Sequence, residues 1–164
     1  MVPDPLLSFV PGIVRRRLRG GATPQADVER IRAVVLAADI SGFTQLVGSL
    51  RETQAGIDEL SGILNDGFAR LIDAIDDEGG DTLGFAGDSL LAYWPDGPDA
   101  LPAAARAGLD AQRRLQSADQ RIRVRIGLGV GELALWTVGG VEDRWLVVAG
   151  GDGPAAAASL QARA

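Results

Sequence analysis

The chain has 164 residues, a length that fits one domain with a sizeable core. It contains no cysteine, no histidine and no lysine, so all 16 basic residues are arginine. These absences exclude a Ser/His/Asp triad, a thiolate nucleophile, an imidazole or thiolate zinc site, a P-loop and Schiff-base chemistry. The formal net charge of -6 argues against nucleic-acid binding, and the remaining carboxylates suit magnesium or manganese.

The first 20 residues carry four arginines and one acid, whereas the rest of the chain is acidic. Residues 6–18 have the composition of a short amphipathic helix for a membrane surface or a partner, but Pro11 and Gly12 interrupt the pattern. We therefore expect a solvated arm, or a strap over the domain, rather than membrane contact. The expected division is an arm and linker over residues 1–25 and a single domain over residues 26–164. No secretory signal or membrane-spanning run is evident, and we expect a cytoplasmic protein.

The first predicted element is a buried strand over residues 31–38, which ends at Asp39. An apolar stripe with intervals of three and four residues then predicts a helix over residues 57–75, stopped by Gly79 and Gly80. Two short strands over residues 82–85 and 89–94 are joined by a turn that contains Asp88, which is typical of a hairpin.

The second half of the chain continues with an alanine-rich helix over residues 98–115 and a strictly alternating strand over residues 121–130. A further pair of strands is predicted over residues 133–138 and 144–148, and residues 153–164 resemble the start of a helix. This order predicts an α+β fold, with helices packed on one face of a mainly antiparallel, ferredoxin-like sheet.

Two short stretches stand out, ADISGFT at residues 38–44 and GGDTLGFAGDSLLAYWP at residues 79–95. Taken singly, each is typical of an ordinary turn or helix cap. If the first strand lies beside the hairpin, however, Asp39 and Asp88 meet at one edge, where two carboxylates repel unless a cation lies between them. The backbone at Gly42 could approach a polyphosphate closely at the start of the following helix. Together the two stretches outline a metal-dependent triphosphate site.

These two stretches resemble the strand and hairpin signatures of class III adenylyl and guanylyl cyclases, closest to the bicarbonate-responsive soluble type and its bacterial relatives. The similarity runs from about residue 31 to residue 160 and includes GLGVGEL at residues 127–133. The resemblance implies the class III cyclase fold without its C-terminal part, and two Mg²⁺ or Mn²⁺ ions held by Asp39, Asp88 and the carbonyl of Ile40. It also implies phosphate binding by the backbone amides of four consecutive residues, Ser41, Gly42, Phe43 and Thr44.

The chain departs from the family pattern at the residues that read the base and stabilise the transition state. Gly84 stands where these cyclases carry a base-binding Lys, so no base-binding residue is predicted. The helix expected to carry an Asn and an Arg begins near Gly153 and is rich in alanine, and the one Asn of the chain is Asn65. Because family sites form across a dimer, the resemblance implies the metal-donating half of a pair, or a fragment whose second half lies downstream. Arg121, Arg123 and Arg125 are the candidates to replace the missing cations.

The leading hypothesis is therefore an enzyme that, with a second cyclase half, converts ATP or GTP to the 3′,5′-cyclic monophosphate and pyrophosphate. A different class of function stays open, a catalytically silent cyclase-like domain for dimerisation or nucleotide sensing. Gly84 and the alanine-rich tail favour that silent domain, whereas the two aspartates favour the enzyme. The third alternative is an acidic interaction domain without a nucleotide site.

Overall fold

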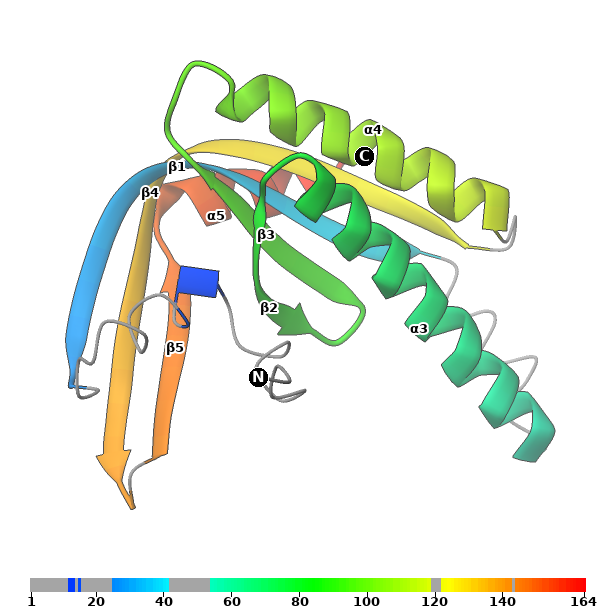
Figure 1. Cartoon of the computed structure of the whole chain (residues 1–164), viewed down its shortest axis with the longest axis horizontal. Coiled ribbons are helices and arrows are strands. Elements are labelled where there is room, and N and C mark those ends of the chain that lie inside the picture. The colour runs from blue at the N-terminus through cyan, green and yellow to red at the C-terminus, as the bar shows by residue number, and fades with distance from the viewer. Residues whose placement is uncertain (1–11, 14, 16–24, 42–53, 119–121, 143) are drawn as a thin grey trace, which may run out of the picture.

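The computed structural model describes residues 12, 13, 15, 25–41, 54–118, 122–142 and 144–164. Its helices and strands follow one another along the chain (Figure 1) as β1 (Asp27–Ser41), α3 (Gln54–Asp77), β2 (Asp81–Ala86), β3 (Ser89–Pro95), α4 (Ala100–Ala118), β4 (Arg123–Val141), β5 (Arg144–Gly150) and α5 (Asp152–Gln161). The predicted α+β class is confirmed, as are the hairpin and the terminal helix.

A curled five-stranded sheet forms the centre of the molecule, with the strand order β2-β3-β1-β4-β5 (Figure 1). Every neighbouring pair of strands is antiparallel. The central strand β1 pairs with β3 on one side and with β4 on the other. The hairpin that carries Asp88 therefore lies directly beside the strand that carries Asp39.

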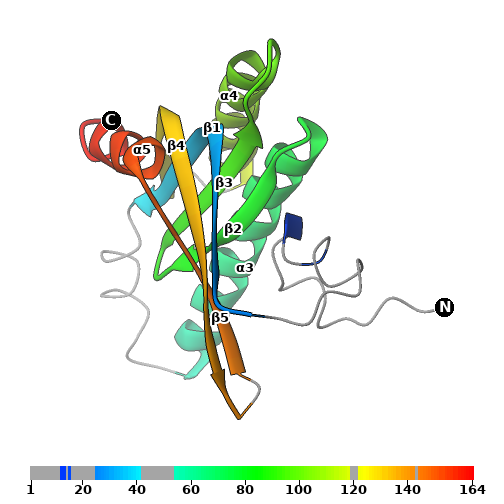
Figure 2. The ribbon, with the colours of Figure 1, turned by 90° about the vertical axis from the view of Figure 1, so that its left-hand side faces the viewer.

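Alternate residues of β1 point to opposite faces of the sheet, and each face has its own core. Val34, Leu36, Ala38 and Ile40 pack with buried residues of α3 and α4. Residues 33, 35 and 37 form a second cluster on the other face with Leu133, Leu135 and, from α5, Ala157. Figure 2 shows the sheet between α5 on one side and α3 and α4 on the other.

The position of α5 corrects the prediction that the helices share one face. Three glycines on β4, two residues apart, allow this helix to approach the strand closely. An added Cβ would lie 2.1 Å from the Ala157 carbonyl oxygen at Gly127, 2.3 Å from the Gly153 carbonyl oxygen at Gly129, and 2.5 Å from Asp152 Oδ1 at Gly131. Because these alternate positions of β4 have no side chains, the backbone of α5 can pack directly against the strand. The sequence pattern alone did not indicate this packing.

Strand β4 corrects a second prediction, because residues 121–130 and 133–138 belong to one strand and not to two. Gly131 lies in the gap between the two predicted strands, but it pairs with Ala33 of β1 in an uninterrupted register that runs from Asp27 to Ser41. Its missing side chain serves the contact with α5. The alternation of apolar residues resumes at Leu133, on the opposite face from Val130.

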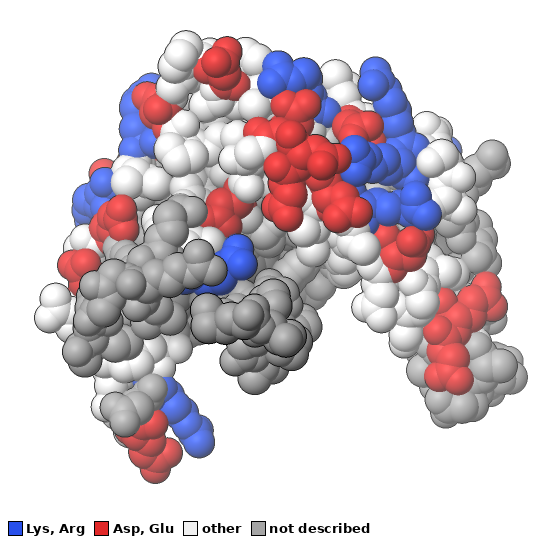
Figure 3. Space-filling view, in the orientation of Figure 1, with Lys and Arg blue, Asp and Glu red and all other residues white. Residues whose placement is uncertain are grey.

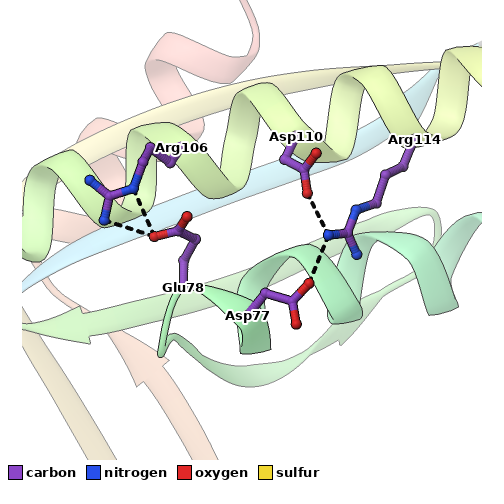
Figure 4. A network of polar contacts seen from close by, with 5 residues as sticks. All are labelled: Asp77, Glu78, Arg106, Asp110 and Arg114. Atoms are coloured by element: carbon purple, nitrogen blue, oxygen red, sulfur yellow. Dashed lines mark hydrogen bonds and ion pairs between the residues drawn. The ribbon is translucent and has the colours of Figure 1, made fainter.

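The two helices on the first face are tied together by ion pairs at the end of α3 (Figure 4). Arg114 Nη2 lies 2.7 Å from Asp77 Oδ2 and 2.6 Å from Asp110 Oδ2, and Arg106 Nη2 lies 2.8 Å from Glu78 Oε2. These hydrogen bonds raise the pKa of both Arg106 and Arg114. Such exposed pairs orient the helices and add little stability. The face seen in Figure 3 accordingly carries acidic and basic side chains next to one another.

The described part of the N-terminal region touches the domain. Ile13 is only 8% exposed and belongs to the second core cluster, and the Gly12 amide donates a hydrogen bond to Asp81 Oδ1 at 2.9 Å. The division between residues 25 and 26 stays a prediction. Within the described ranges, none of the helices combines the length and apolar character needed to cross a membrane.

Candidate active site

The C-terminal end of β1 and the β2–β3 turn meet at one edge of the sheet. Asp39 is paired with Ser89, the first residue of β3, and the Ile40 amide donates a hydrogen bond of 3.1 Å to the Asp88 carbonyl oxygen. The two aspartates that the sequence singled out are therefore brought together by strand pairing. Because the N–H and C=O groups of one strand residue lie on the same edge of that strand, the Ile40 carbonyl also points toward the turn.

Asp39 is the one charged residue buried among those the structure describes, with 9% of its surface exposed. Its Oδ1 accepts a hydrogen bond from Ser89 Oγ at 3.1 Å, and its Oδ2 lies 2.5 Å from Arg125 Nη2. A carboxylate shielded from water needs such partners, because its desolvation is costly. The cation beside Asp39 in this structure is thus a guanidinium, supplied by the paired residue of β4.

Arg125 belongs to the candidate site, but the sequence analysis did not predict its position beside Asp39. It was one of three arginines considered as replacements for missing cations, and its contact with Asp39 was not predicted. The alternation of β4 puts Arg123 and Arg125 on one face, where they pair with Ser41 and Asp39. Among the described atoms, Arg125 Nε is buried without a hydrogen-bond partner. The guanidinium therefore keeps an unused donor beside the aspartate.

The predicted phosphate-binding segment lies largely outside the described residues. The backbone of Ser41 continues β1 and pairs with Arg123, while the side chain of Ser41 and all of Gly42, Phe43 and Thr44 are outside that part of the chain. Their role in phosphate binding stays a prediction.

Gly84 lies in β2 opposite Leu91, next to an irregularity in the strand pairing between Thr82 and Gly84. A Cβ added at Gly84 would meet nothing within 4 Å. The space around residue 84 would therefore accommodate a larger side chain. Steric crowding does not explain why a glycine stands at the position where the family resemblance expects a Lys.

Helix α5 stands where the family resemblance places an Asn and an Arg. After the exposed Asp152 in its first turn, its outward face is formed by small or apolar residues, namely Ala155, Ala158, Ser159 and Leu160. The end of this helix lies over Gly127, because a Cβ there would be 2.3 Å from the Gln161 amide nitrogen. Gly127 is two residues from Arg125 on the same face, so the helix ends beside the Asp39–Arg125 pair without adding a charge between residues 153 and 162.

The donor set at this edge fits a hard divalent cation. Two carboxylates and one backbone carbonyl supply only oxygen, which Mg²⁺ and Mn²⁺ prefer. Within the described residues no group of three or more acidic side chains gathers that could hold a metal by itself. Cation binding here would therefore depend on the backbone, on a bound phosphate and on release of Asp39 by Arg125.

Comparison with known proteins points in one direction, although no family model matches the chain. It is 29% identical to human adenylate cyclase type 10 over 117 residues, and 30% identical to the photoactivated adenylate cyclase subunit beta of Euglena longa over 154 residues. These matches include 65% and 88% of this chain, but only 7% and 17% of those much longer proteins.

Solved structures share the fold of this chain over most of its length. A bacterial light-regulated adenylyl cyclase superposes with a TM-score of 0.81 at 21% identity, over 96% of this chain and 47% of that one. A class III adenylyl cyclase-like ATP-binding protein from Pseudomonas aeruginosa gives a TM-score of 0.72 at 20% identity, over 84% of this chain and 32% of that one. The chain is thus related, in sequence and in fold, to the catalytic domains of the class III nucleotidyl cyclases.

Proposed function

We propose that the chain is the metal-donating half of a class III nucleotidyl cyclase, which forms a 3′,5′-cyclic monophosphate and pyrophosphate from a nucleoside triphosphate when a second half completes the site. The observation that carries the proposal is the meeting of Asp39 and Asp88 at one sheet edge through the Ile40–Asp88 hydrogen bond. The names of the adenylate cyclase relatives support the reaction. Neither ATP nor GTP is favoured, and a cytoplasmic location is part of the proposal.

Asp39, Asp88 and the Ile40 carbonyl would hold two divalent cations at this edge. When bound, such cations lower the pKa of the ribose 3′ hydroxyl for in-line attack on the α-phosphate and neutralise the phosphate charge. Ser89 orients Asp39 by donating to Oδ1, which leaves Oδ2 as the oxygen that Arg125 occupies and a cation would take over. The amides of residues 41–44 would bind the phosphates.

Arg125 would exchange partners when the nucleotide arrives. Its side chain is 43% exposed, and only its Nη2 is committed to Asp39. Once a divalent cation neutralises Asp39, the guanidinium is released, and phosphate oxygens are its natural bidentate acceptors. Arg125 would then stabilise the negative charge that the triphosphate brings to the site.

Replacement of Arg125 distinguishes its role as the partner of Asp39 in the free site from its role in binding phosphate. We expect Arg125→Gln to weaken binding of the manganese–ATP complex by about 10- to 100-fold, because hydrogen bonds between charged groups are lost. Manganese alone should bind only weakly without a phosphate, and this weak binding should not weaken further, since the variant no longer covers Asp39. Isothermal titration of both ligands makes the comparison, with Arg144→Gln as the control because Arg144 is 86% exposed and pairs only loosely with Glu142. Equal loss for manganese alone and for the complex would mean that Arg125 merely holds the site together.

The need for a second cyclase half follows from the base-binding and transition-state residues that α5 and position 84 do not supply. The described residues of α5 carry no Asn or Arg on the outward face, and Gly84 replaces the base-binding Lys. In a symmetric pair of this chain, each composite site would lack both the base-binding Lys and the Asn and Arg of the transition-state helix. The partner would be another cyclase half, in trans or on a longer chain.

A catalytically silent nucleotide-sensing domain remains the alternative. The same absences at Gly84 and on α5 favour it, and one structural neighbour is itself named a cyclase-like ATP-binding protein. The two candidates share a nucleotide site and differ in whether a suitable partner half elicits product.

The direct test of the site is thermal unfolding with manganese and ATP, alone and together. Ligand at about 100 times its Kd stabilises the folded state by about 2.7 kcal/mol, which corresponds to about 5–10 °C in Tm for a domain of this size. We expect that shift only when both ligands are present, since each supports binding of the other. No shift beyond that of the separate ligands would exclude both the enzyme and the nucleotide sensor.

A further inference from the structure

The ends of β1, β4 and β5 expose apolar side chains on the sheet face that α3 and α4 cover elsewhere. Strand pairing puts five of them on this face, namely Val28, Trp136, Val138, Leu146 and Val148. Trp136 is half-buried, and the other four are 42–62% exposed. Figures 1 and 2 show the ends of β4 and β5 reaching beyond α3, α4 and α5. We call these five residues the ribbon patch.

The ribbon patch is continuous across the three strands. Val28, Trp136 and Val148 are paired in one row. Val138 and Leu146 form the next row. Single exposed apolar side chains are ordinary on a protein surface, whereas a contiguous group marks a site of interaction. The exposed parts of these side chains add up to about 400 Å² per chain, which is within the range of patches that are often functional.

Charged side chains of both signs border the ribbon patch at its two ends. Toward the middle of the sheet, Arg30 and Glu132 form an ion pair on the same face. At the tip of the β4–β5 ribbon, Arg144 Nη2 lies 3.7 Å from Glu142 Oε2, and the Arg144 side chain is 86% exposed. An apolar centre within a polar rim is the usual anatomy of a protein–protein interface.

The positions of these charges along the ribbon fit a second copy of the chain. Glu132 and the tip residue Glu142 are each five residues from Thr137, which marks the middle of the patch. When two copies pack this face together with β4 running in opposite directions about Thr137, the apolar rows of one copy lie over those of the other. Glu132 then lies over the tip of the other copy, where Arg144 offers it a cation. A contact between two identical copies requires this kind of self-complementarity.

We propose that the ribbon patch is an interface between two copies of this chain, which pack face to face with their β4 strands antiparallel and with Arg144 of each copy beside Glu132 of the other. This pairing does not depend on the proposed function. Alternation along β1 and β4 puts Asp39 and Arg125 on the opposite face of the sheet, together with α5. The interface therefore leaves that face open to a complementary cyclase half.

The size of the ribbon patch predicts how tightly the copies associate. About 400 Å² is about half of the surface that each partner buries in a standard interface, so the charged rim has to supply the remainder. A contact of this size is typical of weak, reversible complexes. We expect a monomer–dimer equilibrium with a Kd in the micromolar range, measured by sedimentation equilibrium of the full chain over a series of concentrations. A chain that stays monomeric throughout that series overturns the interface.

Leu146→Glu tests the patch itself. The variant puts a carboxylate into the apolar surface, where pairing would strip it of water, and we expect the Kd to rise at least about tenfold. Leu109→Glu is the matched control, because Leu109 is 55% exposed on α4 and the variant makes the same change of charge. It should pair like the parent chain, and circular dichroism should show that both variants are folded. Equal Kd values in the parent chain and in Leu146→Glu would contradict the proposal, because the patch would then not be the contact surface.

Charge reversal tests the direction of pairing. Arg144→Glu brings two acids together at each contact and Glu132→Arg brings two arginines together, so each should raise the Kd about three- to tenfold. The variant with both changes restores opposite charges and keeps the net charge of the parent chain, so it should recover most of the lost affinity. Additive losses in that variant would overturn the antiparallel arrangement. Binding of manganese–ATP should stay the same in all these variants, and its absence from the parent chain would remove the proposed function without affecting the test of pairing.

Discussion

Asp39→Asn and Asp88→Asn should each lower the affinity for the manganese–ATP complex by at least about a hundredfold, because each removes a charged oxygen ligand from a site that has only two. The Ile40 carbonyl and the amides proposed to bind phosphate remain in both variants and cannot replace a carboxylate. Isothermal titration calorimetry with manganese and a non-hydrolysable ATP analogue measures the loss.

The matched control is Asp66→Asn, which also removes an aspartate from an Asp–Arg pair. Asp66 Oδ2 lies 2.7 Å from Arg70 Nε on the exposed side of α3. This variant should bind like the parent chain. Equal manganese–ATP affinity in the parent chain and in both site variants would remove the metal assignment.

The two site variants should differ in stability without ligand. On the sequence alone, two facing carboxylates would repel, so either substitution should be neutral or stabilising. The structure places the Arg125 guanidinium on Asp39, and an Asn there keeps an oxygen acceptor but removes the negative charge that pairs with the guanidinium. We therefore expect Asp39→Asn to lower the stability of the free domain by about 1–3 kcal/mol, while Asp88→Asn keeps the original expectation. Thermal unfolding in the absence of metal compares them.

Local sequence signals were sufficient for most of the fold. The run that ends at Asp39, the hairpin around Asp88 and the alternation after Arg121 are periodic over short windows, and each corresponds to an element of the structure, with β1 and β4 longer than predicted. The same logic failed between residues 130 and 133, where two strands were predicted and the structure has one, with Gly131 inside it as a point of close helix approach. A glycine has the same appearance in sequence whether it bends the chain or admits a neighbour.

The candidate site was predictable only as far as it depends on neighbours in sequence. Asp39 and Asp88 could be paired in advance because a hairpin beside a strand is a common arrangement. The contact between Asp39 and Arg125 joins residues 86 apart, through the register of β1 against β4. The docking of Ile13 likewise depends on a cluster whose buried residues come from β1, β3, β4 and α5. Such contacts arise from tertiary packing, which no short window contains.

The chain alone, even as a homodimer, should form cyclic nucleotide at a rate near background. The exposed residues of α5 are Asp152, Ala155, Ala158, Ser159 and Leu160, and Gly84 has no side chain, so neither α5 nor Gly84 of a second copy would bring a cation to the transferring phosphate. Loss of one positioned donor of this kind typically costs about a hundredfold in rate, and two such losses would cost about ten-thousandfold if independent. The assay uses purified chain with manganese and either ATP or GTP.

Mixing the chain with a complementary cyclase domain tests whether cyclase activity, expected to be near background for the chain alone, can be restored. The partner is the catalytic domain of a class III cyclase that carries the Lys, Asn and Arg, with its own two metal-binding aspartates changed to Asn so that its homodimer is inactive. We expect the mixture to regain activity by orders of magnitude, because the composite site takes its carboxylates from this chain and its cations from the partner. Asp39→Asn or Asp88→Asn in this chain should abolish the gain, and Asp66→Asn should preserve it. Robust turnover by the chain alone, lost in Arg125→Gln, would instead show that the β4 arginine replaces the missing cations, and the requirement for a second kind of half would be wrong.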